Sequence, residues 1–509
     1  MEQPKRTRRG RAGHASSPLP KAVQPLMQIP AYDLGTEEQL DLVHHYSMRI
    51  LEEAGIAFYD EESRTILRRH GVVVDDDHIA RFDRELIGEY LTKAPSQWVH
   101  VARNRANDVI MGGNHIVFAP VAGPPYVEDL AGGGRREGTL ADLINFIKMA
   151  QTSPYIHNQG TEIVTPNDVP YQERHLDIVY NHFKYGDKPT MGQYPIGMCA
   201  RDSVDMARIV FGSEFVENNT VLLGVVNVSS PRRLDDRMLG LMKAYSRTGQ
   251  SLVMTPFILA GAMGPAAVLG TVAQANAEAI AAIAFAQMLN PGTPCVYGPF
   301  LAAVDLQSGS PVFGSAESVL AQMLVAQMAR RYKLPFRGAG TYVSTKTVDA
   351  QAGYESVMSM FSSLLVRSNF VLHGAGWLEN GLASGYEKFA WDNEMLGVFQ
   401  RLLGGVSWDE EEWAMESILN EVPPGGHHLG TAHTLKRFRT AFHRADVFDY
   451  NSYEQWKTNG FPTAVERASS KAQQLLDSYE QPPLDPSIDE ELLAFVARRR
   501  SEVRPSDFE

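Results

Sequence analysis

The sequence predicts an α/β protein: a (β/α)8 TIM barrel with helical extensions at both ends. Between residue 115 and about residue 405, short apolar runs alternate eight times with segments of helical periodicity. Apolar strands that alternate with covering helices are typical of a parallel sheet buried on both faces. The competing fold is an open doubly wound sheet. Its dinucleotide-binding version is disfavoured because no GxGxxG follows the first strand and no acidic ribose ligand lies about twenty positions further on.

The composition is that of a globular protein with a hydrophobic core. The chain has 509 residues, of which 44% are hydrophobic and 21% are charged, and its formal net charge is −13. An acidic protein is poorly suited to coat nucleic-acid phosphates, so no nucleic-acid partner is expected. Cys199 and Cys295 have the spacing of neither a disulfide framework nor a zinc motif. This cysteine usage predicts a cytoplasmic protein.

The longest uncharged stretch does not predict a membrane span. Residues 251–277 carry no charge, but Pro256, Pro265 and several glycines interrupt them, and a spanning helix needs about 20 consecutive apolar residues. We therefore expect a buried strand, a loop and a buried helix here, and no membrane partner.

Changes in residue pattern divide the chain into four segments. Residues 1–30 form a basic arm with too little apolar content to fold, which predicts disorder. Residues 31–110 have the apolar spacing of a helical module. Residues 111–405 carry the barrel. Residues 406–509 are acidic at first and helical throughout, which predicts a helical extension packed on the barrel.

The eight expected strands are short runs that end in small or polar residues. They are HIVFAP at 115, IHNQGTEI at 156, PTMGQYP at 189, VLLGVVNV at 221, SLVMTPFIL at 251, PCVYGPF at 294, PFRGAGTYV at 335 and FVLHGAGWL at 370. A segment of helical period follows each of them, from LADLINFIKMAQ after the first strand to EMLGVFQRLLG after the last.

In such barrels the active site lies at the carboxyl ends of the strands. No strand end offers histidines and carboxylates at metal-ligand spacing, and HExxH is absent, so no metal site is expected. The side chains at these ends are mainly amides, hydroxyls and aromatic rings. Aromatic faces attract desolvated organic cations, and quaternary ammonium groups suit them best. The same rings equally fit a second interpretation, in which they only fill the barrel.

The chain resembles the trimethylamine methyltransferase family, which are corrinoid-dependent methyltransferases with a barrel fold. The motifs that carry the resemblance occur in order: GQYP at 192, NVSSP at 227, GAMGPA at 261, PGTPCVYG at 291, SPVFGSAES at 310, TKTVDAQAGYES at 345, HGAGWLENGLASGYEKFAWDNE at 373, and HTLKRFR and YEQWKTNG in the tail. The similarity covers most of the chain.

The resemblance implies transfer of a methyl group from a methylated amine to the Co(I) of a separate corrinoid protein. It implies no tightly bound cofactor, because the partner supplies the cobalamin, and it implies a homo-oligomer. The chain contains only the twenty common residues, so it is similar to the group of members that lack pyrrolysine. That group is associated with quaternary amines such as glycine betaine, proline betaine and carnitine.

Position within the matching motifs implies a substrate site in which Tyr194, Phe257 and Tyr297 surround the cation. Gln159 and His373 are expected at the far end of the substrate. No catalytic acid or base is assigned. A quaternary amine leaves as a neutral tertiary amine, so an in-line attack needs positioning more than proton transfer.

Four further residues are expected at the rim that faces the corrinoid: Asn227, Gly340, Asp349 and Gln351. Asp349 fits equally well as an acidic residue at the N-terminus of the seventh helix. Two other functions stay open, a non-catalytic barrel that binds quaternary amines and a barrel lyase that works without a corrinoid.

Overall fold

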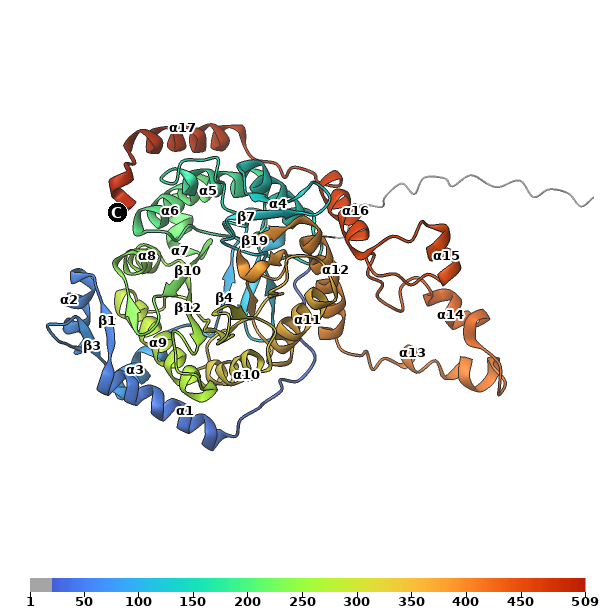
Figure 1. Cartoon of the computed structure of the whole chain (residues 1–509), viewed down its shortest axis with the longest axis horizontal. Coiled ribbons are helices and arrows are strands. Elements are labelled where there is room, and N and C mark those ends of the chain that lie inside the picture. Colours follow the sequence, from blue (N-terminus) through green and yellow to red (C-terminus); the bar gives the residue numbers. More distant parts are fainter. Residues whose placement is uncertain (1–20, 509) are drawn as a thin grey trace, which may run out of the picture.

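The computed structural model describes residues 21–508, in which helices surround curled parallel sheets (Figure 1). The helices that follow the eight predicted strands in turn are α4 (Leu140–Thr152), α5 (Arg174–Tyr185), α6 (Gly197–Phe211), α8 (Asp236–Arg247), α9 (Val268–Leu289), α10 (Ala316–Arg331), α11 (Ala350–Leu365) and α12 (Tyr386–Leu403). The short α7 (Ser213–Asn218) follows α6 directly. The predicted alternation of strand and helix is therefore confirmed as a mixed α/β fold.

The parallel strands form two ladders. In the first, β9 (Thr190–Met191), β10 (Leu222–Val228), β12 (Ser251–Ala260) and β13 (Cys295–Tyr297) pair in that order. In the second, β16 (Arg337–Gly338), β17 (Phe370–Val371) and β6 (Val117–Phe118) pair in that order. The run predicted as a strand at 156 is not a regular strand, since it bends at Asn158 and Gly160 has a positive φ.

One buried cluster lies on the inner, concave side of these strands. It combines side chains from both ladders with Val109 and Met111 of β5 (Val109–Gly112), which pairs with β4 (Gln97–His100). The members that come from the parallel strands and their ends are Val117, Ala119, Met191, Leu223, Val225, Val253, Val296, Phe370 and Leu372. Because side chains alternate along a strand, Asn227, Thr255 and Phe257 lie on this same inner side.

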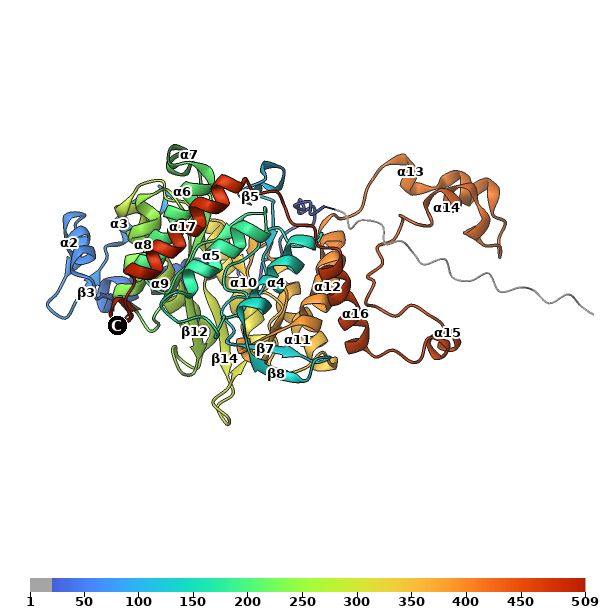
Figure 2. The same ribbon diagram turned by 90° about the horizontal axis from the view of Figure 1, so that it is seen from above.

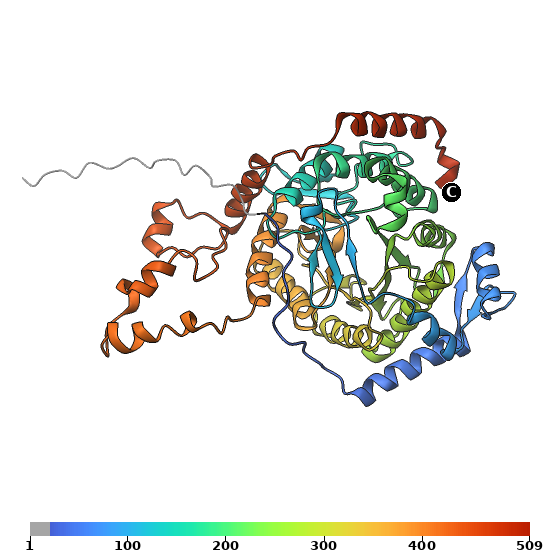
Figure 3. The ribbon, with the colours of Figure 1, turned by 180° about the vertical axis from the view of Figure 1, so that it is seen from behind.

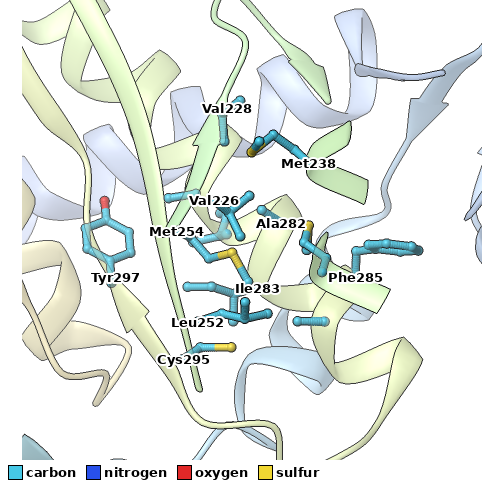
Figure 4. Packing of buried hydrophobic residues seen from close by; sticks show 14 of the residues in the cluster. Val226, Val228, Met238, Leu252, Met254, Ala282, Ile283, Phe285, Cys295 and Tyr297 are labelled. Carbon is cyan, nitrogen blue, oxygen red and sulfur yellow. The ribbon is translucent and has the colours of Figure 1, made fainter. Parts of the chain in front are cut away.

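The outer side of the strands packs against the helices. Tyr297 lies here with Leu252, Met254 and Cys295, among side chains of α8 and α9 (Figure 4). Helix α9 has the length and hydropathy of a membrane span, but most of it is buried inside the protein. The expected strand, loop and buried helix over 251–277 are thus confirmed.

Short strands extend the carboxyl ends of the parallel strands. One group is β7 (Tyr126–Asp129), β8 (Gly134–Glu137), β18 (Trp377–Leu378) and β19 (Ala383–Gly385). The other is β14 (Phe300–Val304), which pairs with the end of β12 and with β15 (Pro311–Val312). These extensions project from one end of the sheet (Figure 2).

The segment predicted as an N-terminal helical module also contains a small sheet. Its helices are α1 (Glu37–Arg49), continued by a π-turn, α2 (Glu61–Arg69) and α3 (Arg84–Leu91). Between them lie β1 (Ile56–Phe58), β2 (Val73–Val74) and β3 (Ile79–Arg81), and β11 (Arg233–Leu234), from the loop after β10, pairs with β1. Strands this short give little periodicity, so the sequence predicted helices alone.

The predicted disordered arm reaches further along the sequence than the structure supports. Residues 1–20 lie outside the described residues. Within 21–30, Gln24 bonds to the backbone of Ile110 on β5 and Met27 is buried. Backbone hydrogen bonds from Met27 to Asn114 and from Gln28 to Leu403 add to these contacts, and such isolated contacts give no helical or strand pattern in the sequence.

The C-terminal extension consists of helices on and beside the barrel (Figure 3). Helices α16 (Ala464–Asp477) and α17 (Pro486–Glu502) pack on it. Before them, α13 (Glu410–Trp413), α14 (Ala432–Arg437) and α15 (Tyr453–Thr458) project sideways (Figure 2). The prediction that this whole extension packs on the barrel is therefore wrong for this projecting part.

Candidate active site

An arginine lies at the centre of the candidate site. Arg337 on β16 is one of the largest fully buried side chains, and it pairs in register with Phe370, which belongs to the inner cluster. Its Nε has no hydrogen-bond partner among residues 21–508, and no carboxylate there contributes to its pKa, which burial lowers. A buried cation without an anion is costly. The arrangement is therefore suited to receive an anionic group from outside the chain.

Aromatic rings surround this arginine. The Arg337 Cζ lies 5.0 Å from the centroid of Phe300. Phe300 stacks on Phe257 at 4.8 Å and meets Tyr342 at 4.7 Å, and Tyr342 meets Trp377 at 4.8 Å. These rings come from β12, β14, the loop after β16 and β18, so the carboxyl ends of neighbouring strands bring them together.

His373 completes this side of the site. Its Nδ1 accepts a hydrogen bond from the Ala122 backbone N–H at 3.1 Å, so the ring proton is on Nε2. Burial lowers the pKa of His373 well below its ordinary value, and the charge of Arg337 lowers it further. The ring is therefore neutral near pH 7, and Nε2–H is a donor with no partner in the described part of the chain. A donor and an unpaired cation side by side favour a carboxylate ligand.

A carboxylate, that of Glu162, lies on the opposite side of the loop that contains Ala122. Gly123, next to Ala122, donates its backbone N–H to the carbonyl of Glu162 at 2.8 Å, and the Tyr194 hydroxyl lies close to Gly123. Burial raises the pKa of Glu162 above its ordinary value, and the hydrogen bond from Thr165 offsets only part of this effect. Burial also raises the pKa of Tyr194, and the Glu162 charge adds to this effect. The site thus has a cationic side and an acidic side.

The structure brings together some of the predicted substrate residues and separates others. Phe257 and His373 lie in the aromatic cluster, and Tyr194 lies beside Glu162. Tyr297 does not join them. It faces the helices and donates its hydroxyl to Asn276 on α9 at 2.8 Å. A cation-binding role for Tyr297 is therefore wrong, because the strand alternation turns it away from the inner side.

Gln159 is also directed away from the inner side. Its amide lies 3.1 Å from that of Gln151 on α4 and 3.3 Å from His182 Nδ1 on α5. A Cβ on Gly186 would overlap it, so Gln159 fills the layer between strands and helices. It therefore stabilises the fold and does not reach the substrate position predicted for it.

The four residues expected at the rim have different surroundings. Asn227 is exposed at the end of β10. Gly340 is required by a close approach, since a Cβ there would lie 2.0 Å from the carbonyl oxygen of His373. Asp349 caps α11 by accepting the Ala352 N–H, which is the alternative role the sequence left open, and Gln351 bonds to Glu355. Asp349 and Gln351 are both exposed.

Two features of the site did not follow from the sequence patterns. The first feature is Arg337. Its signal in the sequence is that it is a lone charge inside an otherwise apolar strand. The second feature, the buried pair of Lys388 and Asp392 on α12, supports the loops that carry Tyr342 and Trp377. Its four-residue spacing resembles that of an exposed helical ion pair. Within residues 21–508, no group of three His, Cys, Asp or Glu side chains could hold a metal ion.

Proteins of known function are similar to this chain over most of its length. The model of the family described as trimethylamine methyltransferase matches residues 3–504. A glycine betaine methyltransferase from Desulfitobacterium hafniense is 40% identical over 476 residues, which cover 93% of this chain and 98% of that protein. A proline betaine:corrinoid methyltransferase from Eubacterium limosum is 28% identical, covering 87% of this chain and 93% of that protein.

Solved structures agree on the fold. The monomethylamine methyltransferase of Methanosarcina barkeri superimposes with a TM-score of 0.50 at 9% identity, covering 91% of this chain and 89% of that one. Its hydroxylamine complex gives a TM-score of 0.51 with the same coverage. From the match to the family model over nearly its whole length, the chain belongs to the trimethylamine methyltransferase family.

Proposed function

We propose that this protein moves a methyl group from a betaine-type quaternary amine to the Co(I) corrinoid of a separate protein. The observation that carries the proposal is Arg337 at the carboxyl ends of the strands, a buried guanidinium to which residues 21–508 supply no anion. Similarity to methyltransferases named for glycine betaine and proline betaine supports it independently. A betaine carries the carboxylate that this arginine lacks, whereas trimethylamine does not.

The polarity of the site matches a zwitterion. The carboxylate of a betaine would accept hydrogen bonds from Arg337 and His373 Nε2–H, and charge-assisted bonds of this kind are the strong ones. The ammonium group would lie toward Glu162 and the ring of Tyr194, because a carboxylate and an aromatic face both attract a desolvated cation. The neighbouring residues Ala122 and Gly123 each contact one side of the site. The Ala122 N–H donates to His373, and the Gly123 N–H donates to the backbone carbonyl of Glu162.

The reaction needs no proton transfer. The electron pair of Co(I) forms the new cobalt–carbon bond while the carbon–nitrogen bond breaks, and nitrogen keeps the bonding pair. The product is a neutral tertiary amine. The chain therefore contributes by holding the substrate in line with the corrinoid and by excluding water, which suits a site whose histidine is neutral.

The corrinoid would approach from the carboxyl ends of the strands. Asn227 is exposed there, and Asp349 and Gln351 are exposed at the start of α11. The neighbouring substrate rings Phe257 and Phe300 are half-buried. These exposures support the proposed rim.

We further propose that the parallel strands close into one eight-stranded barrel. The backbone of segment 156–160 supports this, since His157 N–H donates to Phe118 of β6 and Met191 N–H of β9 donates to Gly160. A parallel bridge between Tyr297 and Phe336 supports contact between the other two edges.

Free, buried Cys199 and Cys295 support the expected cytoplasmic compartment.

The test is anaerobic turnover of glycine betaine with and without cob(I)alamin, with methylcobalamin read from its absorbance. The proposal expects methylcobalamin and dimethylglycine in equal amounts, and neither product without cob(I)alamin. Betaine binding without turnover would instead support a non-catalytic binding protein. Amine breakdown without cobalamin would support a lyase.

A further inference from the structure

Residues 406–442 form a projecting segment, here called the C-terminal arm, whose large apolar side chains are exposed although Trp408 and Trp413 lie beside each other. It leaves the barrel after α12, runs through α13 and α14, and returns (Figures 1 and 3). Ten of the thirty-two exposed large apolar side chains of the described residues lie on these 37 positions. They are Val406, Trp408, Trp413, Met415, Ile418, Leu419, Leu429, Leu435, Phe438 and Phe442.

The arm cannot hold its shape through a core of its own. No hydrophobic side chain between residues 406 and 442 is buried, and Trp408 and Phe442 are 78% and 89% exposed. The contacts within the arm are mainly polar, such as the ion pair of Lys436 with Glu411 at 2.6 Å. Exposed ion pairs contribute little stability, which does not offset the entropy of ordering this length of chain.

The segment that returns from the arm is fixed to the barrel. Asp446 N–H donates to Glu394 on α12 at 2.8 Å, and Lys471 on α16 pairs with Asp446 at 2.8 Å. Ala445 and Val447 are buried. The base is therefore held in place, and the arm presents its apolar side chains at a defined position beside the barrel.

We propose that the C-terminal arm docks on a second copy of this chain. Ten side chains with roughly 100 Å² of exposed apolar surface each supply on the order of 1,000 Å², and a stable interface needs about 800 Å² from each partner. The arm extends sideways from α12 and α16, away from the projecting β14–β15 hairpin at the carboxyl ends of the strands (Figure 2). It therefore leaves the proposed corrinoid approach open.

A second copy also fits better than the corrinoid protein for a kinetic reason, which rests on the proposed function. A corrinoid protein must leave after each methyl transfer to pass the methyl group on, so it would uncover the arm in every cycle. A subunit of the same enzyme covers the arm permanently. Large apolar interfaces are typical of permanent assemblies.

The test is the mass of the full-length protein in solution, which does not depend on methyl transfer. Sedimentation velocity at micromolar concentration is expected to give a multiple of the 56.4 kDa chain mass. The double variant Trp408→Ser/Phe442→Ser should weaken self-association by about 30-fold or more, the effect of losing one strong interface residue. Leu493→Ser, on the exposed side of α17, is the matched control and should keep the assembly.

A wild-type monomer, or a double variant that keeps the wild-type mass, would overturn the proposal. The corrinoid protein would be the partner if the double variant keeps its mass and its transfer to free cob(I)alamin but loses transfer to the corrinoid protein. Hydrogen exchange measured on the wild-type protein is a second test, which does not depend on whether the double variant folds. Amides of 410–437 should be protected at high protein concentration and lose protection on dilution, and unchanged exchange would contradict the proposal.

Discussion

Lys388 and Asp392, one turn apart on α12, form an ion pair in which neither side chain is exposed, with Nζ 2.6 Å from both carboxylate oxygens. Asp392 also accepts hydrogen bonds from Thr341 Oγ1 at 2.8 Å and from the Gly376 N–H at 2.9 Å. One carboxylate therefore connects the loops after β16 and β17. These loops carry Tyr342 and His373, so the pair positions the substrate side of the site from outside it.

Breaking this pair should cost more stability than an ordinary helical ion pair. Lys388→Met leaves Asp392 buried without its cation, which is expected to lower the free energy of unfolding by about 3–5 kcal/mol. Urea denaturation measures this loss. The matched control is Arg49→Met, which breaks an exposed pair with Glu53 at the same spacing and should change the free energy of unfolding far less, because solvent screens that pair. Equal losses in the two variants would contradict a special role for the buried pair.

Removing the unpaired charge of Arg337 should stabilise the ligand-free protein while it impairs substrate binding. Arg337→Met replaces a buried cation, for which the described part of the chain offers no anion, with an apolar side chain of similar length. Thermal unfolding without substrate should therefore shift to higher temperature. The same variant should raise the KM for glycine betaine roughly 10- to 100-fold, the loss of a charge-assisted hydrogen bond. A destabilised apo variant would show that Arg337 has a structural partner.

Glu162→Gln should weaken betaine binding from the other side of the site. The variant keeps the shape of the side chain but removes the charge that faces the ammonium group, and we expect a KM roughly tenfold higher with a small change in kcat. Steady-state methyl transfer measures both constants. Glu137→Gln on β8, which is exposed, is the control. An unchanged KM would place the cation elsewhere.

The free energy of unfolding should decrease as the pH is lowered below about 6.5, because several histidines are buried in the neutral form. Burial lowers the pKa of His100 and His182 to about 4 and that of His157 to about 3. Above about pH 6.5, which is the pKa of histidine in the unfolded chain, these histidines are neutral in both states and do not lower the free energy of unfolding. As pH falls toward 4, the unfolded chain binds protons that the folded chain does not, and each histidine lowers the unfolding free energy by about 1.4 kcal/mol per pH unit. His182→Gln should reduce the slope measured by urea titrations between pH 7 and 5, and identical slopes would contradict this assignment.

The elements that the sequence predicted well are those with strong periodicity. All eight helices that follow the expected strands are present, and long apolar runs such as 251–260 became strands. The segment at 156 was harder to predict. Asn158 and Gln159 bond to His100 and His182, so side-chain contacts replace part of the strand ladder. Pairings between distant short strands, such as β1 with β11, have no local signal.

The site was predicted less completely than the fold because its residues depend on which way each side chain points. Phe257 and Tyr297 look alike in the sequence, yet the first lies on the inner side and the second faces α9. A shift of one residue in the strand register would exchange the faces to which such side chains point. Arg337 was missed because a search for acid–base pairs and metal ligands does not select a lone arginine.

The most direct measurement of the central claim is the ratio of kcat/KM for glycine betaine to kcat/KM for choline, in the wild type and in Arg337→Met. The two compounds share the trimethylammonium group, and only betaine has a carboxylate. The account predicts that the wild type favours betaine by at least about 10-fold, the contribution of a charge-assisted hydrogen bond, and that Arg337→Met removes this preference. Equal kcat/KM values for the two substrates in the wild type, or a preference that survives the loss of Arg337, would contradict it.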